Sequence, residues 1–256
     1  MFYRIYGNGL DIVQAFMLYK MHITMKTIKT VNKKTLCLAV VALGLTGVLS
    51  SCSKHDDDDV YASGSVDVMV VNGNEASAPQ NFYLDDAKIN GSAVAYTEAT
   101  SYVKTRSGNR KGEFRSSVTG QVNTSATYTI QKDRHYTFYY TGNASASDAV
   151  MTEDDLSSPS SGKAKVRYVH LSTAAASNVD VAVQGGAKLI SNLAYKSATA
   201  FSEIEAGTYN LQLLAAGTAN VALSIPNITF QAGKIYTVYV SGATSATISY
   251  HVIVNQ

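Results

Sequence analysis

The chain has 256 residues, of which 46% are hydrophobic and 16% are charged, and its formal net charge is +2. This length allows two ordinary domains or one large β domain. The low charge content, with 17 Tyr and no Trp, favours extracytoplasmic β-structure over a helical cytosolic enzyme. The basic excess lies before residue 52 and the remainder is mildly acidic, so the composition gives no reason to expect a nucleic-acid partner.

The first segment that indicates function is a predicted export signal over residues 25–51. Lysines follow Met25, and the apolar run over residues 36–49 is shorter than the roughly 20 residues of a membrane-spanning helix. The run ends in Leu49-Ser50-Ser51-Cys52, which resembles the recognition sequence of the bacterial lipoprotein signal peptidase. We therefore expect cleavage before Cys52 and attachment to a membrane by acyl chains on that cysteine.

Residues 1–24 do not fit a leader, because Asp11 and scattered polar residues interrupt any signal pattern. The pattern favours Met25 as the initiator, so residues 1–24 are expected to be non-structural. Cys37 lies inside the apolar run and would be removed with the leader. The mature chain then keeps no thiol for a disulfide, a Cys-ligated metal or a Cys nucleophile.

Residues 52–59 form an acidic segment behind the lipidated cysteine, with Lys54 followed by Asp56, Asp57, Asp58 and Asp59. A solvated tether is the simplest interpretation, and a Ca²⁺ site would need a shaped loop. A third interpretation is favoured: the segment resembles the signal that sends lipoproteins to the cell surface in one group of Gram-negative bacteria. We therefore expect an outer-membrane protein that faces the cell surface, with the periplasmic face as the alternative.

The mature part contains an internal repeat. Residues 64–71 correspond to 162–169, Ala95-Tyr96 to Ala194-Tyr195, Gly112 to Gly207, and residues 135–142 to 235–242. The intervening residues are rich in Ser, Ala and acidic residues, as in a linker. The sequence therefore predicts one domain over residues 60–143, a linker over 144–162 and a second domain over 163–256.

Within each copy the hydrophobic residues alternate with polar ones. Val66, Val68 and Val70 form one such series, and Tyr236, Val238 and Val240 form another. A period of two indicates strands with one buried and one solvated face, as in antiparallel sheets. The pattern predicts an all-β chain with two tandem β-sandwich domains of the immunoglobulin-like or transthyretin-like kind.

Four segments of the second copy carry a family resemblance. They are AKVRYVHLS (164–172), NVDVAV (178–183), EAGTYNLQL (205–213) and FQAGKIYTVY (230–239). Together they look like the domain-of-unknown-function family 4397, which is found in bacterial envelope and secreted proteins. The resemblance implies a fold and a location in the cell envelope or outside the cell, but no activity. Asn72 stands in the first copy where the second has His170, and Thr173 stands where the family often has proline.

His170 and Asp180 are the residues that a search for catalysis would select, with Ser172 nearby. A catalytic pair would also need an activated nucleophile, and neither a nucleophile elbow nor a Ser-x-x-Lys pattern is present. We expect hydrogen bonding at turns and strand edges instead, because a catalytic His would not be Asn72 in an active duplicate. The remaining histidines are dispersed, so no catalytic residue, cofactor or metal is predicted.

Two features suggest a ligand. Lys104, Arg106, Arg110 and Lys111, with Arg115 close behind, lie in one basic stretch, which is expected to span an exposed hairpin and is either a ligand contact or a solvated loop. Tyr139 is expected to point outward, where it would stack on a sugar ring. The leading hypothesis is a non-enzymatic lipid-anchored protein for adhesion, envelope structure or binding of an envelope protein. The alternative is a glycan-binding accessory protein of a nutrient-uptake system.

Overall fold

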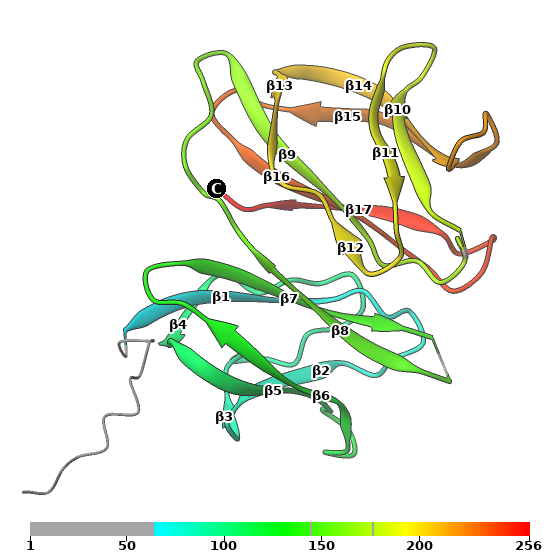
Figure 1. Cartoon of the computed structure of the whole chain (residues 1–256). Helices are drawn as coiled ribbons and strands as arrows, with labels where there is room; N and C mark the ends of the chain where they lie inside the picture. The colour runs from blue at the N-terminus through cyan, green and yellow to red at the C-terminus, as the bar shows by residue number, and fades with distance from the viewer. Residues whose placement is uncertain (1–63, 144, 176) are drawn as a thin grey trace, which may run out of the picture. The chain divides into compact units, whose positions relative to one another are not determined.

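A computed structural model describes residues 64–143, 145–175 and 177–256 of the chain (Figure 1). The predicted leader, Leu49, Ser50, Ser51, the lipidation site Cys52, and the acidic segment with Lys54 and Asp56–Asp59 lie outside the described residues. Within the described residues every regular element is a β-strand. These residues belong to one compact unit, Asp59–Gln256. The prediction of an all-β chain is confirmed.

The first domain is a sandwich of two four-stranded sheets. The sheet with the order β4-β1-β7-β8 consists of β4 (Val103–Arg106), β1 (Ser65–Asn72), β7 (His135–Gly142) and β8 (Ser147–Glu153). The sheet with the order β3-β2-β5-β6 consists of β3 (Ala87–Lys88), β2 (Gln80–Leu84), β5 (Gly108–Ser116) and β6 (Val122–Ile130). Sequence-distant strands therefore pair, as in Greek-key sandwiches.

The second domain repeats this topology. One sheet consists of β12 (Ser197–Ala198) and β13 (Ser202–Glu205), which both pair with β9 (Lys163–His170), followed by β16 (Ile235–Ser241) and β17 (Ser249–Val254). The other sheet has the order β11-β10-β14-β15 and consists of β11 (Lys188–Leu193), β10 (Val179–Val183), β14 (Gly207–Ala215) and β15 (Val221–Phe230). The predicted pair of β-sandwich domains is thus present.

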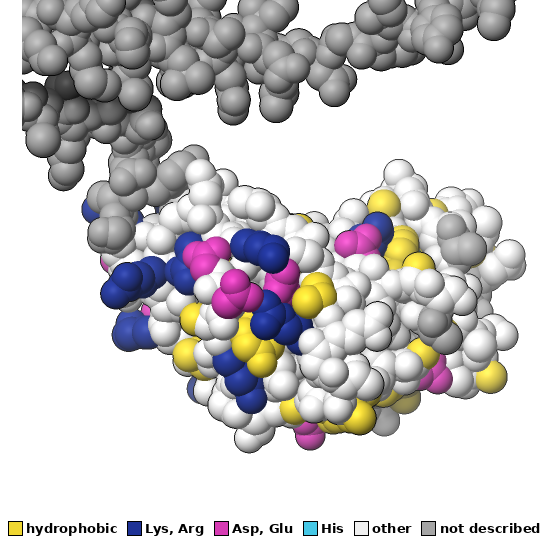
Figure 2. All heavy atoms as spheres, turned by 90° about the horizontal axis from the view of Figure 1, so that it is seen from below, with side chains coloured by type: hydrophobic (Ala, Val, Ile, Leu, Met, Phe, Trp, Pro, Cys, Tyr) yellow, Lys and Arg dark blue, Asp and Glu magenta, His cyan; other side chains and the backbone are white. Residues whose placement is uncertain are grey.

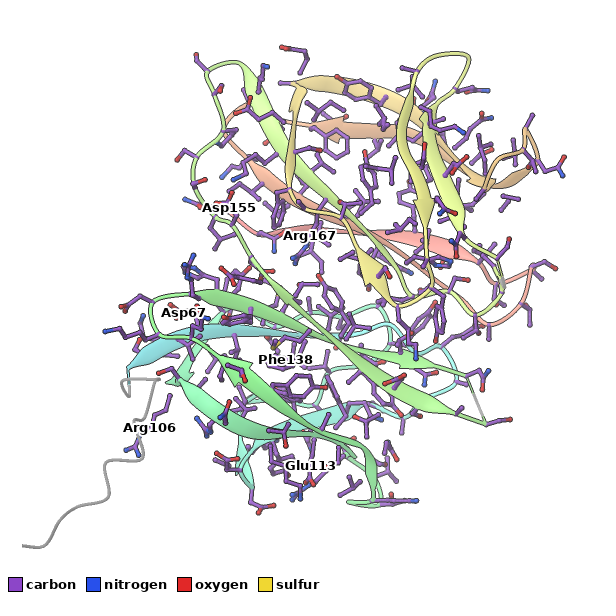
Figure 3. All side chains as sticks on the ribbon, viewed as in Figure 1. Asp67, Arg106, Glu113, Phe138, Asp155 and Arg167 are labelled. Carbon is purple, nitrogen blue, oxygen red and sulfur yellow. The ribbon has the colours of Figure 1, made fainter. Side chains whose placement is uncertain are left out.

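Each domain has its own apolar core between its two sheets. In the first domain Phe138 lies at the centre of the core, with its ring centroid 4.6 Å from that of Phe82 (Figure 3). In the second domain Tyr236, Val238 and Val240 point into the core, as their alternation predicts. The expected alternation of Val66, Val68 and Val70 is confirmed in the same way.

Three details of the sequence-based prediction were wrong. The segment predicted as a linker contains β8, which pairs with β7 and sends Ala149 and Met151 toward the core of the first domain. The residue equivalent to Gly207 is Gly108, not the predicted Gly112. Gly108 pairs with Ile130 in the first domain, and Gly207 pairs with Phe230, the residue equivalent to Ile130, in the second. The connection between the domains is correspondingly shorter than the predicted 144–162.

The third wrong detail concerns the central strands, β1 and β7 in the first domain and β9 and β16 in the second. They pair in parallel, whereas antiparallel sheets were expected. They are also buried on both faces rather than on one. Runs such as Val68–Val71 are continuous in hydrophobicity, which is typical of strands covered on both sides.

Gly142 ends β7 with a φ of 127°, and an added Cβ would lie 2.2 Å from the carbonyl oxygen of Ala146. The Gly142→Ala variant should therefore lose more than about 1 kcal/mol of unfolding free energy, because both the backbone conformation and the contact disfavour a side chain. Thermal unfolding measures the loss. Gly91→Ala is the control, since nothing lies within 4 Å of its added Cβ. Equal melting temperatures for the two variants would contradict the backbone conformation and the close contact described for Gly142.

Candidate functional site

The most strongly constrained polar site in the described residues lies where the two domains meet. Here the faces of the β1–β7 and β9–β16 strands that point away from the cores are covered. The apolar residues that fill this region form a third cluster, separate from the two cores: Met69, Val71, Tyr139, Val169, Leu171, Tyr239 and Ile253. We call this cluster, with the polar residues described next, the interdomain interface.

Arg167 is the charged residue at the centre of the interdomain interface, and its side chain is 1% exposed (Figure 3). Its Nη1 lies 2.6 Å from Oδ1 of Asp154, whose side chain is fully buried. Arg167 also donates to the hydroxyls of Tyr139, at 2.8 Å, and Thr237, at 2.9 Å. The guanidinium packs 4.6 Å from the ring centroid of Phe201.

Asp154, directly after β8, accepts further hydrogen bonds that satisfy its carboxylate. Tyr102 donates at 2.6 Å and Thr137 at 2.5 Å. Asn255 donates to the Tyr102 hydroxyl at 3.1 Å and so links this network to β17. Burial and the charge of Asp154 both raise the pKa of Tyr102, so that it stays neutral. Burial opposes the charged form of Arg167, but its neighbours Tyr139 and Asp154 raise its pKa overall.

Aromatic residues close the rest of the interdomain interface. The ring centroids of Tyr139 and Tyr239 are 6.4 Å apart with the planes at 60°. Tyr96 and Ser241 share a 2.9 Å hydrogen bond, and Ser241 also contacts Nε2 of His251 at 2.9 Å. Burial lowers the pKa of His251, which favours the neutral imidazole at neutral pH. The arrangement holds two domains together with few charges.

The structure contradicts the predicted orientation of Tyr139. Its side chain is 0% exposed and lies in the interdomain interface beside Arg167 and Tyr239. Alternation correctly places it opposite Phe138, but that opposite face meets the second domain instead of solvent. Tyr139 therefore cannot stack on a sugar in this structure.

The predicted basic stretch lies on strands β4 and β5, but these strands belong to different sheets and do not form the expected hairpin. Figure 2 shows basic side chains interspersed with acidic ones on this face. Arg110 pairs with Asp85, and Lys111 pairs with Glu113 at 2.6 Å. The remaining members behave differently: Lys104 pairs with Asp67 at 3.2 Å and is 74% exposed, and Arg106 lines a surface hollow beside Ser65. The positive charge of the stretch is largely offset by its own neighbours.

His170 and Asn72 occupy equivalent positions, and each side chain accepts a hydrogen bond from the backbone N–H two residues later. Nδ1 of His170 accepts the backbone N–H of Ser172 at 3.3 Å, and Oδ1 of Asn72 accepts that of Asn74 at 3.0 Å. Burial lowers the pKa of His170, which keeps the ring neutral and able to accept. Ser172 donates to the carbonyl of Gly242 at 2.8 Å. These contacts agree with the expected hydrogen bonding at strand ends.

Asp180, the other residue that a search for catalysis would select, is buried. It pairs with Lys188 at 2.6 Å and accepts the backbone N–H groups of Asn192, at 2.7 Å, and Gly217, at 3.0 Å. The Lys188 ammonium and these N–H groups lower the pKa of Asp180 to about 2. The carboxylate therefore fixes two loops of the second domain and is separate from the contacts of His170.

The depressed pKa of Asp180 predicts an acid-sensitive contribution to stability. Its stabilising effect is complete above the unfolded-state pKa of about 4 and is lost as the pH falls toward 2. Asp180→Asn should therefore lower the unfolding free energy at pH 7 and flatten its decline between about pH 4 and pH 2. Urea unfolding at a series of pH values measures both effects. Parallel curves for the two proteins would contradict the assigned role.

The sequence alone did not single out Arg167, Asp154, Tyr102 or Asn255. One signal was available: Arg167 alternates with the core residues Val166 and Tyr168, and its face of β9 continues with Val169 and Leu171. An Arg on an otherwise apolar strand face indicates a covered surface with a charged partner. The identity of that partner depends on the domain packing, which no local pattern encodes.

Among the described residues, no group of three or more His, Cys, Asp or Glu side chains is arranged to hold a metal ion. The same residues include no helix with the length and hydropathy needed to cross a membrane.

Comparison with known proteins places the chain in a family. A search of curated proteins found no match to this chain. One solved structure, the family CBM26 module CBMbc from Eubacterium rectale Amy13K in complex with maltoheptaose, is similar over 73% of this chain and 96% of its own, at 9% identity and a TM-score of 0.26. A similarity at this level says nothing about a ligand. The family model "Domain of unknown function (DUF4397)" matches residues 66–182 and 173–256. These matches span most of the chain, which therefore belongs to the DUF4397 family.

Proposed function

We propose that this chain is a non-enzymatic protein of the bacterial cell envelope, anchored through lipid on Cys52 and exposed at the surface of the outer membrane. In this proposal its two domains act as one rigid module for adhesion, envelope structure or binding of an envelope protein. The anchor rests on the sequence Leu49-Ser50-Ser51-Cys52 and the surface address on Lys54 and the aspartates that follow it.

The observation that supports a rigid module is the burial of the Arg167–Asp154 pair between the domains. Flexible tandem domains meet over small polar surfaces, whereas a buried ion pair requires a fixed geometry with its remaining hydrogen bonds satisfied. The residues that a catalytic site would use are also engaged in structural contacts, as His170 and Asp180 illustrate. Such a chain is suited to holding or spacing a partner rather than to chemistry.

Protease shaving of intact cells tests the anchor and the address together. The wild-type protein should fractionate with membranes and be degraded by external protease. Cys52→Ala should appear in the soluble fraction, while Cys37→Ala, which changes the leader's own cysteine, should stay in the membrane fraction. Membrane retention of Cys52→Ala would contradict the anchor. Full protection of the wild-type protein would contradict the surface address and favour the periplasmic face.

Glycan binding by an accessory protein of nutrient uptake is the second candidate. The observation that favours it is Tyr83, a half-buried aromatic residue of the first domain. The Arg115 guanidinium covers one face of its ring, 4.2 Å from the centroid, so a sugar would stack on the opposite face. Flat aromatic faces beside hydrogen-bonding groups suit sugar rings. A glycan array should lose its signal with Tyr83→Ala but not with Lys104→Ala. An array that is blank for the wild-type protein would exclude this candidate.

A further inference from the structure

The interdomain interface has an internal symmetry that follows from the repeat. In the β1–β7 pair Met69 lies opposite Thr137, and in the β9–β16 pair Arg167 lies opposite Thr237. Met69 and Arg167 are therefore equivalent residues, as are Thr137 and Thr237. By the same registers Val71 is equivalent to Val169, and Tyr139 to Tyr239. All of these residues belong to the apolar cluster or to the polar contacts of Arg167 and Asp154 described above.

The last strands extend this symmetry. The backbone N–H of Asp154 bonds to the carbonyl of His135, and that of Asn255 bonds to the carbonyl of Ile235. Asp154 and Asn255 are thus equivalent, and they accept equivalent hydrogen bonds, from Thr137 at 2.5 Å and from Thr237 at 2.8 Å. Each domain contributes the same set of positions to the interface.

Contacts that cross between the domains also occur in equivalent pairs. Tyr96 of the first domain meets Ser241 of the second at 2.9 Å, and Tyr195 of the second meets Thr141 of the first at 3.5 Å. The Tyr139–Tyr239 ring contact joins a residue to its own equivalent. A patch that meets its own counterpart in this way is the arrangement of an isologous, two-fold interface.

The copies differ at several interface positions, for example Tyr102 and its counterpart Phe201, and Lys196 of the partly exposed Lys196–Asp148 pair has Thr97 as its counterpart. At the buried centre of the interface the difference in charge involves one pair of positions, and both members differ. The second domain has Arg167 where the first has Met69, and the first has Asp154 where the second has Asn255. As a result, a first–second pairing brings one cation and one anion together. A second–second pairing would bury two Arg167 side chains with only Asn255 opposite, and a first–first pairing would bury two Asp154 carboxylates. Unpaired buried charges are strongly disfavoured.

We propose that the covered sheet face of this domain is a homotypic docking surface, whose partner is another copy of the same domain, and that the Arg167–Asp154 pair selects the unlike copy. The apolar residues and tyrosines common to both copies supply the attraction. The buried Arg167–Asp154 pair supplies the specificity, because like pairings would leave its charges buried without a partner, whereas the exposed Lys196–Asp148 pair contributes little. This inference is independent of the lipid anchor and of the cell-surface address.

A chain cut after folding tests the proposal. A protease recognition sequence is placed between Ser158 and Ser161, in the exposed connection between the domains, and the intact folded protein is cleaved there. The halves are incubated under mildly destabilising conditions to allow exchange, and native mass spectrometry identifies each pairing by mass. The wild-type halves should give first–second pairs, with a preference of about a hundredfold or more over like pairs.

The informative variant is Arg167→Met/Asp154→Asn, which gives both domains the same Met and Asn at these positions. Its halves should form first–first and second–second pairs alongside the unlike pairs. A second variant, Met69→Arg/Asn255→Asp, gives both domains an Arg and an Asp, and should also form like pairs. If the first variant does not fold, this second variant tests whether the ion pair selects the unlike domain.

Three results would overturn the proposal. Separation of the wild-type halves into monomers would show that the surface does not dock. Like pairs from the wild-type halves would show that the ion pair does not select. Strictly unlike pairs from both double variants would place the selectivity elsewhere.

Discussion

Replacing Arg167 by Met should lower the free energy of unfolding by about 3–5 kcal/mol, because the substitution leaves Asp154 buried without its cation. The loss should exceed that expected from the removed hydrogen bonds to Tyr139 and Thr237 alone, because the Asp154 carboxylate stays buried without its cation. Urea unfolding followed by tyrosine fluorescence and by circular dichroism measures the effect.

Two matched variants separate the buried pair from an ordinary ion pair. Lys104→Met breaks the exposed pair with Asp67 and should cost less than about 1 kcal/mol. Arg167→Met/Asp154→Asn removes both charges and should recover part of the loss seen with Arg167→Met alone. A single variant no less stable than Lys104→Met would mean that Arg167 is not buried between the domains.

Replacing Phe138 by Ala should cost about 3–5 kcal/mol, because it opens a cavity in the core of the first domain. The ring is 0% exposed and packs against Phe82, at 4.6 Å between centroids, and against the edge of Tyr128, at 5.1 Å. Collapse of the neighbouring rings can fill little of the space, because both are held in strands. Equilibrium urea unfolding measures the loss.

The duplication supplies the control for this substitution. Val238 is the equivalent core residue of the second domain, and Val238→Ala removes fewer buried carbon atoms. Its loss should be about 1.5 kcal/mol from the transfer of two methyl groups, before any cavity contribution. A larger loss from Val238→Ala than from Phe138→Ala would contradict the described packing of the first core.

The sequence predicts the parts of the fold that local periodicity encodes. Alternation places Val66, Val68 and Val70 toward one core, and the same pattern places Tyr236 and Val238 toward the other. Comparison of the copies predicts the duplication itself. The family resemblance of the second copy is confirmed by the match over residues 173–256, and a second match begins at residue 66.

The remaining features depend on contacts between residues far apart in the chain. Four of the seven residues of β8 are polar (Ser147, Asp148, Thr152 and Glu153) and they do not alternate regularly with the apolar ones. Its strand character comes from pairing with β7. Alternation distinguishes Phe138 from Tyr139 but does not state whether the second face meets water or another domain. The role of Arg167 depends on Asp154 across the interface, and a partner of this kind has no signature in either strand alone.

Calorimetric unfolding of the full chain tests the central claim, that the two domains form one rigid module through the buried pair. The account predicts a single transition whose calorimetric and van't Hoff enthalpies agree, with a ratio of about 1, because neither domain can unfold without exposing the interdomain interface. Arg167→Met should separate this into two transitions. Two independent transitions in the wild-type protein would contradict the account.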